Sequence, residues 1–227
     1  LFVTLHYATG QAKGMVLNAS DSRVTGFEIR MVGTFILPNA ARGVFDHNLL
    51  SSAELNYQAE KGSPSKYPIN NVVQYNRMID TSLWSTDPSI QAIPWLFIKQ
   101  DLRLNGKETP WRRVGGLSEV AAVTGQGGAN QLVIRYNTIE GYFNGVNAYS
   151  PGFDRYAKSG YDIYGNTIRN IADDALEPDK GAINWRIWDN RIESISIAVS
   201  IAPLNYGPLY LFRNEIWQLG NAGVGAD

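Results

Sequence analysis

The stretch NTIRNIADDALEPDKG (166–181) contains four acidic side chains, Asp173, Asp174, Glu177 and Asp179. Two carboxylates held a few ångströms apart cannot both ionise freely, so together they can act as an acid–base pair. The same oxygens could instead contribute to a calcium site, because Ca²⁺ takes about six to eight oxygen ligands. A third interpretation is a solvated turn, in which Asp, Asn and Gly are common residues. Choosing among the three depends on the elements that position this stretch.

A repeated pattern along the chain predicts those elements. Six segments share the form apolar-x-apolar-x-x-Asn-x-apolar, with asparagines Asn48, Asn76, Asn137, Asn166, Asn190 and Asn214. Their spacings are 28, 61, 29, 24 and 24 residues, and we interpret the interval of 61 as two units. DSRVTGFEI extends the series toward the N-terminus, with Ser22 in the asparagine position.

Each repeat predicts a strand, a one-residue bend and another strand. The alternation before each asparagine has the period of a half-buried strand. Asparagine tolerates the left-handed backbone of a bend, and its amide bonds locally. Asparagines stacked in successive coils could bond to one another as a ladder.

A second alignment predicts which side chains point inward. GVNAYSP (145–151), ALEPDKG (175–181) and AVSIAP (198–203) place Val146, Leu176 and Val199 inside, and Asn147, Glu177 and Ser200 outside. Glu177 and Asp179 would then share the solvent face of one strand, and Asp173 and Asp174 would lie in the turn before it. Three short strands in every coil indicate an all-β fold, a parallel β-helix.

The rungs YNTIEGYFNGV, GNTIRNIADDAL and DNRIESISIAV resemble the repeats of the pectin-lyase-like superfamily, across about 130–227 and more weakly across 20–80. The resemblance implies a single-stranded right-handed parallel β-helix with a sugar groove over the outer face that carries Glu177. ADDAL matches one element of the polygalacturonase pattern. Asn144 stands where another element has a carboxylate, and ISIAVSI lacks the expected histidine, so no subfamily is assigned.

This resemblance implies an extracellular glycoside hydrolase or polysaccharide lyase, acting on a polysaccharide that could contain uronic acids. The predicted catalytic groups are Asp173, Asp174 and Glu177. Predicted substrate contacts are Asn147, Tyr149 for stacking, and Arg155 and Lys180 for anionic sugar groups. We expect no required cofactor, and Asp174, Glu177 and Asp179 are the predicted ligands should Ca²⁺ bind. The alternative is a non-catalytic carbohydrate-binding, adhesin or tailspike-like β-helix.

Aromatic side chains surround the same coils. Tyr142, Phe143 and Tyr161 could stack on sugar rings or fill the coil. Trp185 and Trp188 are three residues apart, so they should point to opposite faces of one strand, one toward the core and one outward.

The composition narrows the remaining classes. The chain of 227 residues is 44% hydrophobic, has a net charge of −1 and contains no cysteine. We therefore expect no nucleic-acid partner, no membrane partner and no disulfide framework. We expect one domain over 1–227, part of a longer chain, with irregular coils and protruding loops at 80–131. The expected location is secreted or cell-surface, with the periplasm as an alternative, and the oligomeric state is left open.

Overall fold

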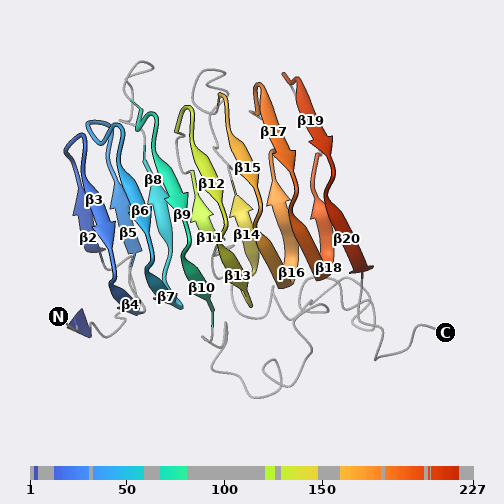
Figure 1. Cartoon of the computed structure of the whole chain (residues 1–227), viewed down its shortest axis with the longest axis horizontal. Helices are drawn as coiled ribbons and strands as arrows, with labels where there is room; N and C mark the ends of the chain where they lie inside the picture. The colour runs from blue at the N-terminus through green and yellow to red at the C-terminus, as the bar shows by residue number, and fades with distance from the viewer. Residues whose placement is uncertain are drawn as a thin grey trace, which may run out of the picture.

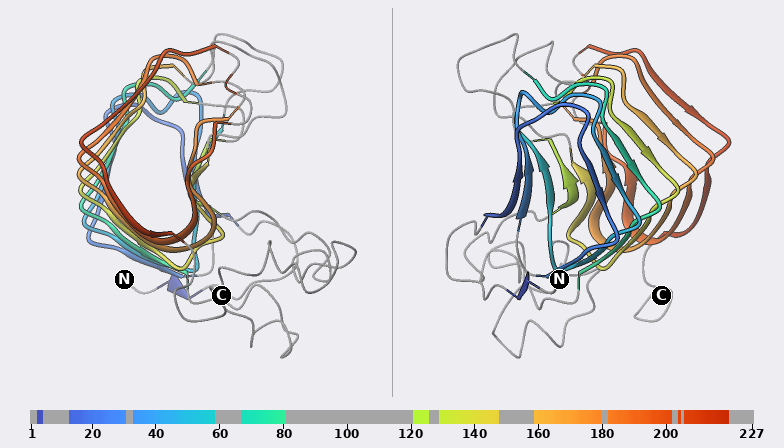
Figure 2. Two further views of the ribbon diagram at one scale, coloured as in Figure 1. Left: turned by 90° about the vertical axis from the view of Figure 1, so that its right-hand side faces the viewer. Right: turned by 60° about the vertical axis from the view of Figure 1, so that its left-hand side comes forward.

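The computed structural model consists of short β-strands, and no helix occurs among the residues that it describes. Figure 1 shows these strands side by side in sequence order along the molecule, and in Figure 2 successive coils superpose into one ring. None of the described segments is a helix long and apolar enough to cross a membrane. The described residues are 3–4, 13–30, 33–58, 67–80, 121–125, 129–147, 159–179, 182–201, 204 and 206–219.

The strands form three parallel sheets, which confirms the predicted right-handed parallel β-helix. The first sheet contains β3 (Arg23–Thr25), β6 (Val44–Asp46), β9 (Val72–Gln74), β12 (Val133–Arg135), β15 (Asp162–Tyr164), β17 (Trp185–Trp188) and β19 (Leu209–Phe212). The second contains β4 (Glu28–Arg30), β7 (Leu49–Ser51), β10 (Arg77–Ile79), β13 (Thr138–Glu140), the beginnings of β16 (Thr167–Glu177) and β18 (Arg191–Val199), and β20 (Glu215–Leu219).

The third sheet contains β2 (Lys13–Leu17), β5 (Gly33–Ile36), β8 (Leu55–Tyr57), β11 (Ala121–Thr124), β14 (Asn144–Asn147) and the ends of β16 and β18. The short β1 (Val3–Thr4) pairs with β4. Seven coils follow from this order: β3–β5, β6–β8, β9–β11, β12–β14, β15–β16, β17–β18 and β19–β20. They are numbered coil 1 to coil 7 below.

Stacked apolar side chains fill the interior of the ring. The central residues of the first-sheet strands in coils 3 to 6 are fully buried, Val73, Ile134, Ile163 and Ile187. Burying each such side chain contributes roughly 1.5–3 kcal/mol. On the third sheet, Val146 pairs in register with Leu176, and Leu176 with Val199, as the second sequence alignment predicts. Trp185 is fully buried and Trp188 is partly exposed, as their spacing predicts.

The six predicted asparagines form one continuous row at the corner between the first and second sheets; we call it the asparagine row. The side-chain nitrogen of each donates to the side-chain oxygen of the next, over 3.1, 3.0, 3.0, 2.9 and 2.9 Å. The same oxygens accept the backbone N–H of the preceding asparagine. These buried amides thus satisfy one another, and the predicted ladder is confirmed.

Three details of the predicted corner are wrong. The left-handed residue precedes the asparagine, as with Tyr136 at φ 55° before Asn137. The asparagine position of coil 1 holds Phe27, whose backbone N–H donates to Asn48, and not Ser22. The interval of 61 residues is one coil, because the Asn76 side chain bonds directly to Asn137. The long segment between β10 and β11 hides this register in the sequence.

An aromatic stack runs outside the asparagine row. His47, Tyr75 and Tyr136 occupy the left-handed position and stack with ring centroids 5.3 and 5.2 Å apart. Coil 5 has Gly165 there, and a Cβ at this residue would lie 2.6 Å from the Tyr136 ring. Glycine is therefore required by space as well as by its φ of 64°. The aromatic row continues one residue earlier in each coil: Tyr164 meets Tyr136 edge to face, and Tyr164, Trp188 and Phe212 stack on one another.

Candidate functional site

The predicted catalytic residues all lie on β16, in coil 5. Asp173 and Asp174 are inside the strand and not in a turn, and they are only 2% and 5% exposed. The pairing of β16 with β18 shifts register between Ile171 and Asp174, so the strand is irregular at these two residues. Interpreting this stretch as a solvated turn is therefore wrong for the described residues.

Glu177 is the last residue of β16 and is 8% exposed. Asp179 lies beyond the strand end, in a turn, and is also 8% exposed. The two side chains therefore do not share one strand, and neither faces open solvent, contrary to the sequence prediction. Their burial depends on tertiary packing, which the sequence pattern does not show.

Coil 4 supplies amides to these carboxylates. The side-chain nitrogen of Asn144 donates to Oε2 of Glu177 over 3.0 Å, and its oxygen accepts the backbone N–H of Asp174 over 3.1 Å. Asn147 lies in register beside Glu177. A Cβ at Gly145 would collide with the carbonyl oxygen of Ala175, so glycine permits this close approach of the two coils. Asn144 thus fixes Glu177 from one side.

Coil 6 contributes from the other side. The hydroxyl of Ser200 donates to Oδ1 of Asp179 over 3.2 Å, and its backbone N–H donates to the carbonyl of Leu176. The acidic groups of coil 5 are therefore held between an amide of one neighbouring coil and a hydroxyl of the other.

These contacts belong to a longer row of polar side chains along the third sheet, which we call the third-sheet polar row. Register pairs Asn56 with Thr124, Thr124 with Asn147 and Asn147 with Glu177, and Ser200 follows in coil 6. The first four are at most 8% exposed. Among the described residues, both amide atoms of Asn56 are buried without a hydrogen-bond partner. A polar row with an unsatisfied amide is unlike a purely structural ladder.

Sequence reasoning missed Asn56 and Thr124. Counting the interval of 61 residues as two units placed a coil that does not exist between Asn76 and Asn137. With this interval counted as one coil, the alignment of the repeats would have placed both residues in the same row as Asn147 and Glu177.

A second carboxylate pair, Glu54 and Asp80, was also missed. Burial raises the pKa of Glu54 to about 7, and the negative charge of Asp80 adds to the shift. The available signal was the repeat alignment, because Ser52 and Asp80 each follow an asparagine of the row by four residues. The Ser52 N–H donates to the carbonyl of Ile79. Glu54 lies three coils from Glu177, about 14 Å at the usual strand spacing, so it belongs to another location.

Only part of the remaining predicted contacts lies within the described residues. Tyr149, Arg155 and Lys180 lie outside the described residues. Tyr142, Phe143 and Tyr161 are at most 2% exposed, so their rings are not open to a ligand. The two tyrosines belong to the core inside the ring. Within the described ranges, no three acidic or histidine side chains come together as a metal ion would need, and the calcium ligands stay a prediction.

Comparison of the chain with protein-family models, with curated proteins and with solved structures finds no match. The fold is therefore shown by the described strands alone, and membership of the pectin-lyase-like superfamily stays a proposal.

Proposed function

We propose that this protein acts on a polysaccharide at the third-sheet polar row, with Glu177, Asp173 and Asp174 as its acid–base groups. The observation that carries this proposal is the hydrogen bond from Asn144 to Glu177, which fixes a carboxylate of coil 5 beside the amides of coil 4. Catalytic carboxylates need such fixed positions, because small displacements lower rates strongly. The resemblance of the rungs to pectin-lyase-like repeats adds support, since it implies a sugar groove over this face.

The proposed chemistry is hydrolysis of a glycosidic bond. One carboxylic acid transfers its proton to the leaving oxygen, while a second carboxylate removes a proton from the water that bonds to the anomeric carbon. Asn147 would bond a sugar hydroxyl beside Glu177, and Tyr149 would stack on a ring. Elimination on a uronic-acid chain is the alternative reaction, and it would use Arg155 and Lys180.

The test is an activity panel of neutral and uronic-acid polysaccharides. New reducing ends report cleavage, and ultraviolet absorbance of unsaturated ends reports elimination. We expect Glu177→Gln to lower the rate by roughly 10²- to 10⁴-fold, the usual contribution of general acid–base catalysis. Glu215→Gln is the matched control, because Glu215 is an exposed carboxylate in coil 7.

Two results would contradict the proposal: cleavage of no substrate in the panel, or equal rates for Glu177→Gln and the control. Either would favour the non-catalytic carbohydrate-binding, adhesin or tailspike-like β-helix.

The proposal includes a location and a cofactor requirement. We propose a secreted or cell-surface protein, where polysaccharides are accessible, that needs no cofactor. Activity should therefore survive a calcium chelator, and its loss, restored by added Ca²⁺, would support the alternative in which Asp174, Glu177 and Asp179 bind the ion.

A further inference from the structure

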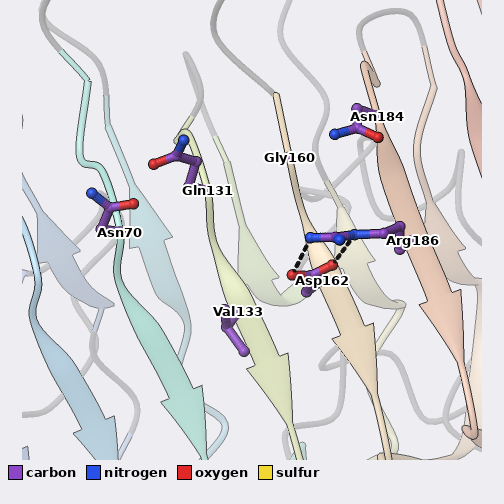
Figure 3. Close-up of a pocket in the computed structure, with 7 residues that line it drawn as sticks. All are labelled: Asn70, Gln131, Val133, Gly160, Asp162, Asn184 and Arg186. Carbon is purple, nitrogen blue, oxygen red and sulfur yellow. Dashed lines mark hydrogen bonds and ion pairs between the residues drawn. The ribbon is translucent and has the colours of Figure 1, made fainter.

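A groove of about 400 Å³ lies on the outer face of the first sheet. Its rim carries the exposed amides Asn70, Gln131 and Asn184, and its floor carries Val133, Asp162 and Arg186 (Figure 3). The groove crosses coils 3 to 6, a length of about 14 Å at the usual strand spacing. This face of the ring is distinct from the third sheet, where Glu177 lies.

One corner position in the groove bears no side chain. At the corner before each first-sheet strand the backbone is left-handed, at Asn70, Gln131, Gly160 and Asn184 with φ between 52° and 71°. Backbone bonds stack these residues directly: the N–H of Gln131 donates to Ser159, and that of Gly160 to Ile183. Gly160 bears no side chain, so a notch opens between Gln131 and Asn184.

The floor of the groove carries a paired charge. Arg186 donates from Nη2 to Oδ2 of Asp162 over 2.6 Å, and its Nε lies 2.6 Å from Oδ1. This ion pair, which contains one hydrogen bond, cancels the formal charges among the lining residues. An anionic polymer such as nucleic acid or polyuronate would find no excess cation here. A neutral ligand suits the groove better.

The lining groups favour hydroxyls as partners. Each amide offers donors and an acceptor, as a sugar hydroxyl does, and Val133 offers an apolar surface to sugar C–H groups. Amides occupy the corner position in coils 3, 4 and 6, so a chain lying along the stack could bond to more than one of them. Tyr164 follows Asp162 by two residues on β15, and Trp188 follows Arg186 by two residues on β17. These two rings stack on each other, with their centroids 4.4 Å apart. Their mutual stacking covers the facing ring surfaces, so recognition in the groove depends on hydrogen bonds.

From these features we infer that the first-sheet groove binds a neutral oligosaccharide chain lying along the coil stack, as a binding site separate from the proposed catalytic row. The inference goes beyond the proposed function and shares with it only the class of ligand. A protein with both sites would hold a polysaccharide on one face while another face acts on it.

The experiment measures binding by titration calorimetry. The probes are cellohexaose, mannohexaose and xylohexaose, with oligogalacturonate as the anionic comparison. The parent protein carries Glu177→Gln, so that cleavage does not consume the probes. Gly160→Asn fills the notch, and the backbone accepts it because Asn70 and Asn184 occupy the same position in coils 3 and 6.

A second variant, Asn184→Gly, removes a rim amide and keeps the left-handed backbone. The matched control is Arg42→Asn, at the same corner in coil 2 with φ 56°, outside the groove. Circular dichroism and thermal unfolding check that each variant folds. Should Gly160→Asn fail to fold, Asn184→Gly decides the outcome.

We expect at least one neutral hexasaccharide to bind, with affinity lowered roughly tenfold by Gly160→Asn, a change of about 1.4 kcal/mol. Asn184→Gly should weaken binding severalfold, and Arg42→Asn should leave it unchanged. Three results would overturn the inference: no binding of any neutral probe, binding that folded groove variants retain, or tighter binding of oligogalacturonate that depends on Gly160.

The same variants separate this inference from the proposed function. Cleavage by the protein with Glu177 intact should be lost on Glu177→Gln and retained at saturating substrate on Gly160→Asn. Failure of groove binding would leave the catalytic proposal standing, and failure of cleavage would leave the groove standing.

Discussion

Two rows of buried polar side chains run along this β-helix, and they are built differently. The asparagine row repeats one residue type, and every described link joins an amide nitrogen to the next amide oxygen. The third-sheet polar row changes from Asn56 to Thr124, Asn147, Glu177 and Ser200, and its contacts differ from coil to coil.

This difference indicates a different role for each row. Identical amides at an identical spacing satisfy one another, so the asparagine row stabilises the stack and offers nothing to a ligand. In a row of unlike groups, with the carboxylate of Glu177 and an Asn56 amide that has no hydrogen-bond partner, the side chains do not satisfy one another in this way. Such a row fits a ligand better than it fits a repeating scaffold.

The largest expected effect is on stability, from Asn137→Ala in the asparagine row. This change removes four hydrogen bonds, to Val73, Asn166 and the two nitrogens of Asn76. Buried groups left without partners should lower the free energy of unfolding by about 4 kcal/mol, measured by chemical denaturation. Asn70→Gly, at an exposed corner, is the control. A loss of unfolding free energy below about 1 kcal/mol would contradict the proposal that this row stabilises the fold.

Glu54→Gln should have the next largest effect, and only at high pH. The folded pKa of about 7 exceeds the ordinary value of 4.5, so the folded state holds the proton more tightly than the unfolded state. The contribution of Glu54 to the stability of the parent protein is therefore fully present below about pH 4.5, and up to about 3 kcal/mol is lost as the pH rises through 7.

The glutamine variant should lose no such stability. Denaturation at about pH 5 and pH 8 tests this, and parallel pH profiles for the two proteins would contradict it. The result sharpens the comparison, because it shows whether carboxylates near the third sheet oppose folding while the amides support it.

A smaller effect is expected at the aromatic stack outside the asparagine row. Gly165→Ala puts a Cβ 2.6 Å from the Tyr136 ring, at φ 64°, and should cost about 2 kcal/mol. Gly26→Ala is the matched control, since it occupies the same corner of coil 1 at φ 74° with nothing within 4 Å. The difference in melting temperature isolates the ring contact, and equal losses would show that backbone strain alone matters.

The smallest effect is expected from Ser200→Ala in the third-sheet polar row. Ser200 loses one hydrogen bond to Asp179, at a partly exposed position, so stability should fall by less than about 1 kcal/mol. Because Ser200→Ala and Asn137→Ala both introduce alanine, their losses of stability compare the two rows directly. A loss as large as that at Asn137 would remove the distinction between them.

The sequence predicted the asparagine row residue by residue, because each asparagine follows a strand pattern that recurs along the chain. It predicted the inward Val146, Leu176 and Val199 for the same reason. It failed at Asn56 and Thr124, because one coil contains an interval of 61 residues and the periodicity is lost there. It also placed Asp173 and Asp174 in a turn, since an Asp-Asp pair is typical of turns; the register shift inside β16 is not visible in composition.

The sequence by itself determined that the chain coils, where the coils bend and which side chains point inward, because these are short-range patterns of polarity repeated along the chain. Only the tertiary structure decided that Asn144 bonds Glu177, that Glu54 lies near Asp80 and that Gly160 leaves a groove between Gln131 and Asn184. Those features join residues from different coils, and their burial and pKa depend on neighbours whose distance in the sequence varies with every loop.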